Sequence, residues 1–444
     1  MSGPTAGFDL AGGLAPTAGR GPAVASDSDS DSGTGQEPGP DLDHLLRPLF
    51  RAAAPGGGVA VVVIRGDERT VACRGHSDRS AERPVRADTR FELGSVTKTF
   101  TGLLLAEMAA RGEVGYDDPI DRYLPADAAP GYPHERPITL LHLATHTSGL
   151  PRLPVGLLPT AAPRWFTRPY ATFGPTHLLR ALPRTPVRGT PGAQVRYSNL
   201  GCGLLGLLLA NAAGQRYDDL LEARVCGPLG LVDTSCGPGQ EEAAGYRRGR
   251  RVPSFRLPAL PGAAALRSTA DDMLRYLQAH LALDAVPLPE RADAAALRTA
   301  LGEVRRPRAG RRRSGARICL GWNRRPVAPD NGGGAGRRRG DGGESDGFGL
   351  GLGFGDGFGD ALGGEGAAEV PDLSEVSELS EIDEVVYHAG ATRGFTTFVG
   401  FSPRAQVGLA VMAGALQLRS RGFVQGAFDT LRTLVAERRE EPPR

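Results

Sequence analysis

The stretch "GSVTKTFTG", residues 94–102, contains the single Lys of the chain. Lys and Arg together number 52, yet every basic residue other than Lys98 is Arg. A low Lys content beside abundant Arg, Ala and Gly is typical of a codon bias. A Lys that remains under such a bias is expected to perform a task that Arg cannot.

Residues 95–112 have apolar side chains at helical spacing, and Gly112 marks the end of the predicted helix. Ser95 then lies at the helix N-terminus, and Lys98 lies one turn later on the same face. A Ser hydroxyl becomes a good nucleophile only when a base removes its proton. Arg stays charged, whereas burial moves the pKa of Lys toward neutrality. We therefore interpret Ser95 and Lys98 as a nucleophile and its base. The alternative is a lone Lys whose amine extends from the helix into water.

The composition indicates a folded core interrupted by low-complexity chain. The hydrophobic fraction of 40% and the charged fraction of 23% are ordinary for a globular protein, and the net charge of +2 gives no case for a polyanionic partner. Gly (63) and Pro (36) are in excess. We expect a disordered segment over 1–43 and a low-complexity Gly/Arg/acidic insert over 327–383. One domain is expected from 44–326 and 384–444.

Local patterns predict strands near both ends of this domain and helices between them. Residues 58–66 and 70–75 read as a β-hairpin, and 385–415 as further strands. Helices are expected over 42–50, 197–214 and 268–283, with a short helix within 138–151 that ends at a Ser-Gly turn and a last helix near the C-terminus.

Three short motifs appear in order: Ser95–Lys98, "YSN" at 197–199 and "HAG" at 388–390. Longer stretches around them include "FELGSVTKTFTG", "LLHLATHTSGLP" and "HAGATRGFTTFVGFSP". The chain resembles the class C β-lactamase branch of the penicillin-recognising serine hydrolases, with their D-alanyl-D-alanine carboxypeptidase and esterase relatives. The resemblance covers most of 58–326 and 384–440. It implies an α/β fold of the α+β type, in which an antiparallel sheet is flanked by helices. A mainly helical subdomain would span about 120–300.

The resemblance also implies catalytic roles. Ser95 would attack a substrate carbonyl and become acylated. Lys98 would accept the proton, or would hold Tyr197 as a phenolate that accepts it, and the two groups titrate together. Tyr197 would also protonate the leaving group. Asn199 would hydrogen-bond the substrate amide or the Lys98 ammonium, unless it is a plain helix cap.

The third motif would supply the substrate-binding strand, with His388, Gly390 and Ala391. The backbone N–H groups of Ser95 and Ala391 would form the oxyanion hole. His388 departs from the family pattern, which often has Lys there, and its charge is conditional near neutral pH. Arg393 would be either a substitute for that charge or an ordinary solvated Arg at the strand end.

The implied function is a serine hydrolase that acts through an acyl-Ser95 intermediate on an ester or amide substrate. A β-lactamase or D-alanyl-D-alanine carboxypeptidase is the alternative within the family. We expect no cofactor and no metal, since the one i, i+4 His pair, His142 and His146, is better explained by burial and backbone bonding. Pro151 and Arg152 are expected at the mouth of the cleft.

The start of the chain lacks a leader pattern, and its apolar runs are too short to cross a bilayer. The cysteines are odd in number and widely spaced, which favours reduced thiols: Cys73, Cys202, Cys226, Cys236 and Cys319. These features favour a cytoplasmic protein without membrane partners, and hence an intracellular substrate. The oligomeric state stays open.

Two readings of another class stay open. The runs "RRPRAGRRR" (305–313) and "RRR" (337–339) are compatible with nucleic-acid binding, but no aromatic residues interleave them and an acidic run follows, so no nucleic-acid partner is expected. The chain would alternatively be a scaffold that binds ligands without turnover.

Overall fold

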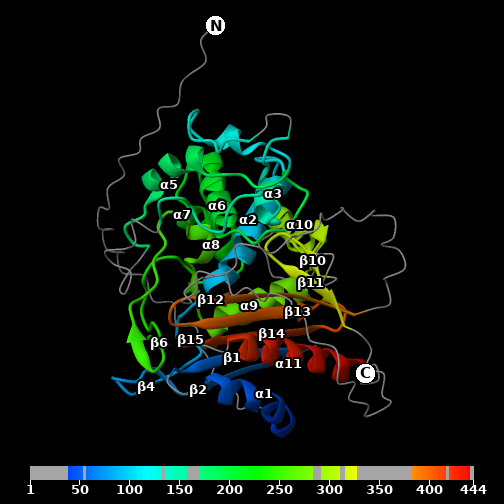
Figure 1. Ribbon diagram of the computed structural model, residues 1–444. Helices are drawn as coiled ribbons and strands as arrows, with labels where there is room; N and C mark the ends of the chain where they lie inside the picture. Colours follow the sequence, from blue (N-terminus) through cyan, green and yellow to red (C-terminus); the bar gives the residue numbers. More distant parts are fainter. Residues whose placement is uncertain are drawn as a thin grey trace, which may run out of the picture. The chain divides into compact units, whose positions relative to one another are not determined.

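The computed structural model describes residues 39–53, 57–132, 136–157, 170–283, 292–310, 316–327, 383–416 and 420–440 (Figure 1). Nearly all of the expected disordered segment and of the low-complexity insert lies outside these ranges. The described residues all belong to one compact unit.

An eight-stranded antiparallel sheet lies at the centre, in the order β2-β1-β14-β13-β12-β11-β10-β9. Its strands come from both ends of the domain, and β1 pairs with β14 so that Val59 faces Ala413. The sequence "VAVVVI" forms a strand because β-branched side chains suit a pleated surface, and its residues are buried on both faces. The strands are β1 (Val59–Arg65), β2 (Glu68–Arg74), β9 (Ala309–Gly310), β10 (Arg317–Ile318), β11 (Asn323–Pro326), β12 (Glu384–Ala391), β13 (Thr396–Ser402) and β14 (Val407–Ala413). The predicted antiparallel sheet is confirmed.

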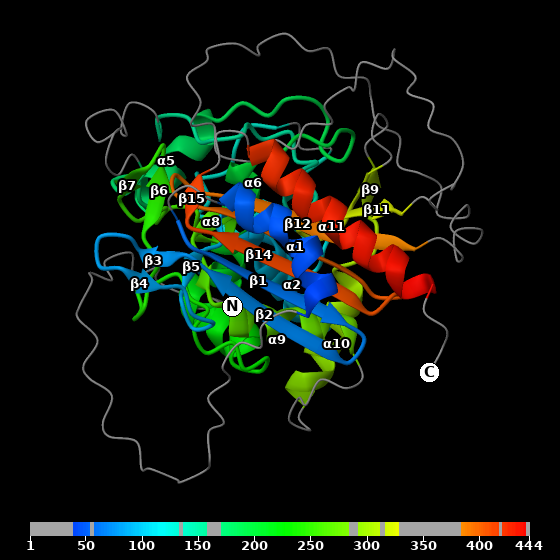
Figure 2. The ribbon, with the colours of Figure 1, turned by 90° about the horizontal axis from the view of Figure 1, so that it is seen from below.

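Helices α1 (Pro40–Ala53) and α11 (Ser420–Glu440) cover one face of the sheet (Figure 2). Leu42, Leu46 and Leu49 recur at helical spacing and are buried in a shared core with α11. Because α1 begins at Pro40, the boundary expected after residue 43 lies one turn too late.

The other face carries α9 (Ala270–Leu281), which packs on β1 and β14. Beyond it lie α2 (Thr97–Ala110) and α10 (Ala292–Glu303), which pack together. The helical part continues through α3 (Leu140–Ala144), α5 (Pro175–Ala181), α6 (Asn199–Ala213), α7 (Tyr217–Leu221) and α8 (Pro261–Ala264). Helix α9 thus belongs to the sheet layer, although it falls within the range expected for the helical subdomain.

Short strands and turns connect these layers. They are β3 (His76–Asp78), β4 (Arg83–Pro84), β5 (Phe91–Glu92), β6 (Gly245–Arg247), β7 (Arg250–Val252), β8 (Arg267–Ser268), β15 (Ala415–Leu416), η1 (Gly94–Val96), η2 (Ile120–Tyr123), η4 (Leu182–Arg184) and the π-helical turn η5 (Glu222–Cys226). The short β5 pairs with β8, and β5 lies directly before the Ser95 turn in the chain.

The short helix expected within 138–151 is present but ends before the predicted Ser-Gly turn, since α3 spans Leu140–Ala144. Thr139 caps its start in a capping box with His142. His146 has a φ of 61°, which lies in the left-handed region and ends helical geometry.

The insert leaves and re-enters the fold at one place. Strands β11 and β12 pair as an antiparallel hairpin, and Val327 N–H donates to the Asp383 carbonyl at 2.6 Å just beyond them. Val327 and Asp383 are both buried. The expected insert is therefore one residue too long at each end.

The described part of the Arg-rich run 305–313 is engaged with the fold. Arg306 and Arg308 both pair with Glu303, at 2.8 and 2.6 Å, and Arg308 lies over the ring of Tyr116. Within the same described ranges, no helix combines the length and apolar character needed to cross a membrane.

Candidate active site

Ser95 lies in the tight turn η1, directly before α2, and is 1% exposed. Gly94 before it has a φ of 53°, and a Cβ there would lie only 2.7 Å from the Ala391 carbonyl oxygen. Thr397 Oγ1 on β13 donates to the Leu93 carbonyl at 2.8 Å. Glycine and this bond let the Ser95 turn lie directly against the end of β12.

Lys98 is buried at the first turn of α2, with 1% of its surface exposed. Its Nζ donates to Ser95 Oγ at 3.0 Å and to the Ala263 carbonyl on α8 at 2.8 Å. The alternative of a Lys that extends into water is therefore wrong. Ala263 could not be found from residue types, because a backbone acceptor leaves no trace in them.

Tyr197 brings a third polar atom to the same hydroxyl, since its OH donates to Ser95 Oγ at 2.8 Å. Lys98 Nζ lies 5.1 Å from the centroid of its ring. The ring also packs against His146, with centroids 4.5 Å apart. The structure thus brings Ser95, Lys98 and Tyr197 together although Tyr197 lies about a hundred residues away in sequence.

The start of α6 holds Tyr197 in place. Ser198 caps this helix, because its Oγ accepts from Gly201 N–H at 2.9 Å and donates to the Pro151 carbonyl at 2.7 Å. His146 Nδ1 accepts from Ser198 N–H at 3.2 Å. The buried Asn199 begins the helix two residues after Tyr197, and its N–H donates to the Arg152 carbonyl at 3.1 Å. Pro151 and Arg152 therefore border the site, as expected.

The expectation for the two histidines is confirmed. His142 Nδ1 accepts from Thr139 N–H at 3.2 Å and His146 bonds the backbone of Ser198. In the part of the chain that the structure describes, no three His, Cys, Asp or Glu side chains gather in a way that could hold a metal ion.

The third motif lies on β12, beside the Ser95 turn. A Cβ on Gly390 would come within 3.0 Å of Ser95 N and closer still to the Leu93 carbonyl. Gly390 therefore permits the approach that places Ala391, at the strand end, next to Gly94. This brings the backbone of Ser95 and of Ala391 to one place.

His388 is 5% exposed on the same strand. Burial, with a smaller contribution from the charge of Lys98, lowers its pKa to about 3. Neither ring nitrogen has a hydrogen-bond partner among the described residues. The imidazole is therefore neutral at ordinary pH, and it brings no positive charge to the site.

Arg393 follows β12 and is only 9% exposed, so the expectation of a solvated strand-end Arg is wrong. Burial and the neighbouring Arg247 lower its pKa. Arg393 and Arg152 both lie close enough to Tyr170 for their positive charges to oppose the rise that burial causes in its pKa. Arg152 also lies 5.7 Å from the Tyr197 ring centroid. Positive charge therefore gathers near Tyr170, beside the Ser95 cluster.

The chain is similar to known proteins over most of its folded length. The family described as Beta-lactamase matches residues 46–423. D-alanyl-D-alanine-carboxypeptidase/endopeptidase AmpH of Escherichia coli (strain K12) is 32% identical over 246 residues, which are 53% of this chain and 60% of that protein. A Beta-lactamase of the same strain is 35% identical over 228 residues, 50% of this chain and 56% of that protein. Esterase EstB of Burkholderia gladioli is 32% identical over 280 residues, 54% of this chain and 69% of that protein.

The chain spans about three fifths of the length of AmpH, the first of these relatives. The match to the family runs from α1 into α11 and includes the Ser95 turn, Tyr197 and the strand of His388. Because the family match covers well over half of the chain, this protein belongs to the beta-lactamase family.

Proposed function

We propose that this protein is a serine hydrolase that cleaves an ester or amide through an acyl-Ser95 intermediate. The observation that carries the proposal is the convergence of Lys98 Nζ and Tyr197 OH on Ser95 Oγ, at 3.0 and 2.8 Å. A buried hydroxyl bonded by an amine and a phenol is the arrangement that an activated nucleophile requires.

In the acylation step, Ser95 Oγ forms a bond to the substrate carbonyl carbon. Its proton passes to the Lys98–Tyr197 pair, whose members titrate together. The tetrahedral intermediate then breaks its bond to the alkoxide or amine, which takes a proton from Tyr197. In the second step a water molecule attacks the acyl carbon and gives a proton to the same pair. The pair returns a proton to Ser95 Oγ as its bond to the acyl group breaks and the carboxylic acid leaves.

The negative oxygen of the intermediate needs donors fixed in advance. We assign this role to the N–H groups of Ser95 and Ala391, which the close packing of Gly390 on the Ser95 turn supports. Asn199, buried two residues from Tyr197, is assigned to the amide or ester of the bound substrate. His388 and Gly390 line the strand side of the same site.

The neutral state of His388 favours an esterase or peptidase over a β-lactamase, because it offers no fixed charge to a substrate carboxylate. The β-lactamase or carboxypeptidase alternative is supported by the names of two relatives, AmpH and a Beta-lactamase of Escherichia coli. A cytoplasmic location is a further part of the proposal, supported by five cysteines that are all free thiols. We propose no nucleic-acid partner.

The test is to incubate the protein with a fluorophosphonate probe and to locate the adduct by mass spectrometry. The proposal expects one label on Ser95, and none in Ser95→Ala. Tyr197→Phe is expected to keep the ring packing, and Ser95 in this variant is expected to be labelled about 100-fold more slowly. Label at another residue, or none on a folded protein, overturns the proposal and favours a ligand-binding scaffold. A comparison of the turnover of a nitrophenyl ester with that of a penicillin and a cephalosporin then distinguishes the two substrate classes.

A further inference from the structure

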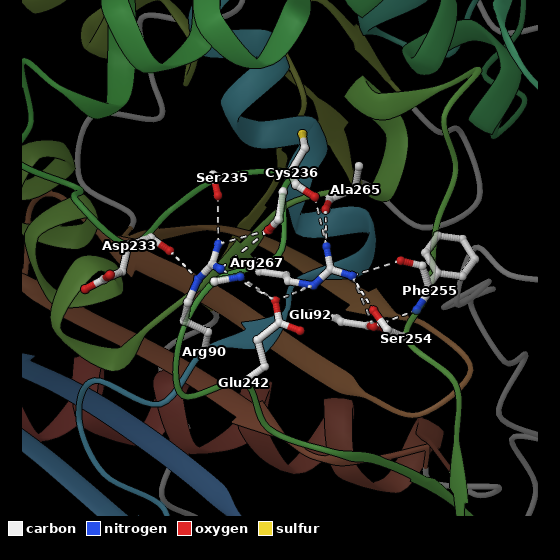
Figure 3. Close-up of polar contacts among 12 residues, drawn as sticks. Arg90, Glu92, Asp233, Ser235, Cys236, Glu242, Ser254, Phe255, Ala265 and Arg267 are labelled. Carbon is white, nitrogen blue, oxygen red and sulfur yellow. Dashed lines mark hydrogen bonds and ion pairs between the residues drawn. The ribbon is translucent and has the colours of Figure 1, made fainter. Parts of the chain in front are cut away.

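Glu92 and Arg267 form a buried ion pair (Figure 3). Glu92 lies on β5, three residues before Ser95, and faces Arg267 across the β5–β8 pair. The two side chains are each 7% exposed, with Nη2 and Oε1 3.6 Å apart. Neither residue has a role in the chemistry described above.

The pair hydrogen-bonds both backbone polar groups of Phe255. Phe255 N–H donates to Glu92 Oε1 at 2.7 Å, and Arg267 Nη2 donates to the Phe255 carbonyl at 3.0 Å. Arg267 Nη2 also donates to Ser254 Oγ at 2.6 Å, and Ser254 hydrogen-bonds the Glu92 carboxylate. Figure 3 shows these bonds converging from both sides of the pair. The loop at 254–255 is therefore clamped by groups of opposite charge.

This loop leads to the wall of the active site. The Phe255 ring meets Tyr170 edge-on, with centroids 5.9 Å apart. Tyr170 in turn lies near Arg152, whose guanidinium is 5.7 Å from the Tyr197 ring centroid. A movement of Phe255 would therefore displace Tyr170 and, with it, Arg152 beside the Tyr197 ring.

Glu92 also holds the opposite wall. Its carboxylate hydrogen-bonds the Thr392 side chain. Thr392 directly follows Ala391, and its N–H donates to the Phe395 carbonyl at 3.0 Å. One carboxylate therefore connects the segment that carries Ser95, the strand end that carries Ala391 and the Phe255 loop.

We propose that Glu92 and Arg267 are positioning residues, which fix the Ala391 N–H and the Phe255–Tyr170 wall relative to Ser95. The inference rests on the proposed function, since positioning matters only if Ser95 reacts. Donors at an oxyanion hole act through their preset geometry, and a misplacement of about 1 Å can cost about 100-fold in rate. A buried charge pair with satisfied hydrogen bonds is a rigid means of setting that geometry.

The test compares two buried carboxylates. Glu92→Gln keeps the shape of the side chain but removes its charge. Glu107→Gln is the matched control, because Glu107 is 0% exposed on α2 and pairs with Arg111 and Arg224 at the end of the helix away from Lys98. Both variants are expected to lose stability. Only Glu92→Gln is expected to lower kcat for the nitrophenyl ester, by about tenfold or more with KM within twofold, because the nucleophile and its base stay in place.

Melting temperatures show whether each variant is folded in the assay. If Glu92→Gln does not fold, Ser254→Ala replaces it, since this change removes one bond to each member of the pair and is expected to lower kcat about threefold. Equal kcat per folded molecule in Glu92→Gln and Glu107→Gln overturns the positioning role, as does an unchanged kcat in Ser254→Ala where it is the variant used. A wild-type protein without Ser95-dependent turnover instead overturns the proposed function, so the two failures are distinguishable.

Discussion

Substitution of Gly390 by Ala tests whether the close approach of β12 to the Ser95 turn is needed for reaction. The added Cβ would lie 3.0 Å from Ser95 N and closer to the Leu93 carbonyl and Thr397 Oγ1, and Cβ atoms essentially never come nearer than 3.0 Å to such atoms. Two of these atoms are backbone and cannot rotate away. The strand and the turn must therefore separate by about 1 Å. This moves the Ala391 N–H away from the position beside Ser95 where the substrate carbonyl oxygen would bind.

A separation of this size is expected to slow acylation by about 100-fold, equivalent to about 2.7 kcal/mol at 1.36 kcal/mol per tenfold. The assay is the second-order rate of fluorophosphonate labelling at Ser95, measured per folded molecule. Gly400→Ala is the matched control on neighbouring β13, since its Cβ would lie 2.8 Å from Leu431 Cδ2 and 3.0 Å from Tyr387 Cβ. Both variants are expected to lose about 1–3 kcal/mol of stability. Labelling of Gly390→Ala at the wild-type rate would refute the reasoning, whatever its stability.

The remaining predictions concern the amine and a buried imidazole. Lys98→Arg is expected to lower the kcat of ester turnover by at least about 1000-fold, because a guanidinium stays protonated and cannot accept the Ser95 proton; turnover within tenfold of wild type contradicts this. His280 is 0% exposed, its ring stacks on Phe401 at 4.9 Å, and burial lowers its pKa to about 3. The unfolded chain takes up a proton near pH 6.5 and the folded one does not, so stability falls below that pH, by about 2 kcal/mol at pH 5. His280→Phe is expected to remove this loss, which is measured as the difference in the free energy of unfolding by urea between pH 7.5 and pH 5. The same difference in the variant as in the wild type would show that the expectation is wrong.

The residues to which we assign the chemistry were predictable because their types are unusual and their order is fixed. Lys98 is the single Lys of the chain, and its spacing from Ser95 placed both on one helical face. The hairpin of β1 and β2 and the later strands were predictable because their apolar runs are bounded by turns. The family resemblance supplied Tyr197, which no local pattern connects to Ser95.

Other features were not predictable because they depend on contacts distant in sequence. The link from Glu92 to Phe255 spans 163 residues, and it joins a side chain to a backbone N–H, which any residue type would offer. Helix α3 ends at Ala144, and His146 just after it has a left-handed backbone and bonds Ser198, a contact distant in sequence that the local pattern does not show. The neutrality of His388 follows from burial, and composition gives no measure of burial.

The hairpin formed by β11 and β12 has a consequence for how this chain tolerates change. Val327 N–H donates to the Asp383 carbonyl just beyond its open end, so the two described positions that flank residues 328–382 are fixed side by side. The register of β12 is set by its pairing with β11 and β13 on either side, where Tyr387 faces Asn323 and Gly400. The strand beside Ser95 therefore takes its position from its two neighbours in the sheet, and not from the number of residues that separate it from β11 in the chain.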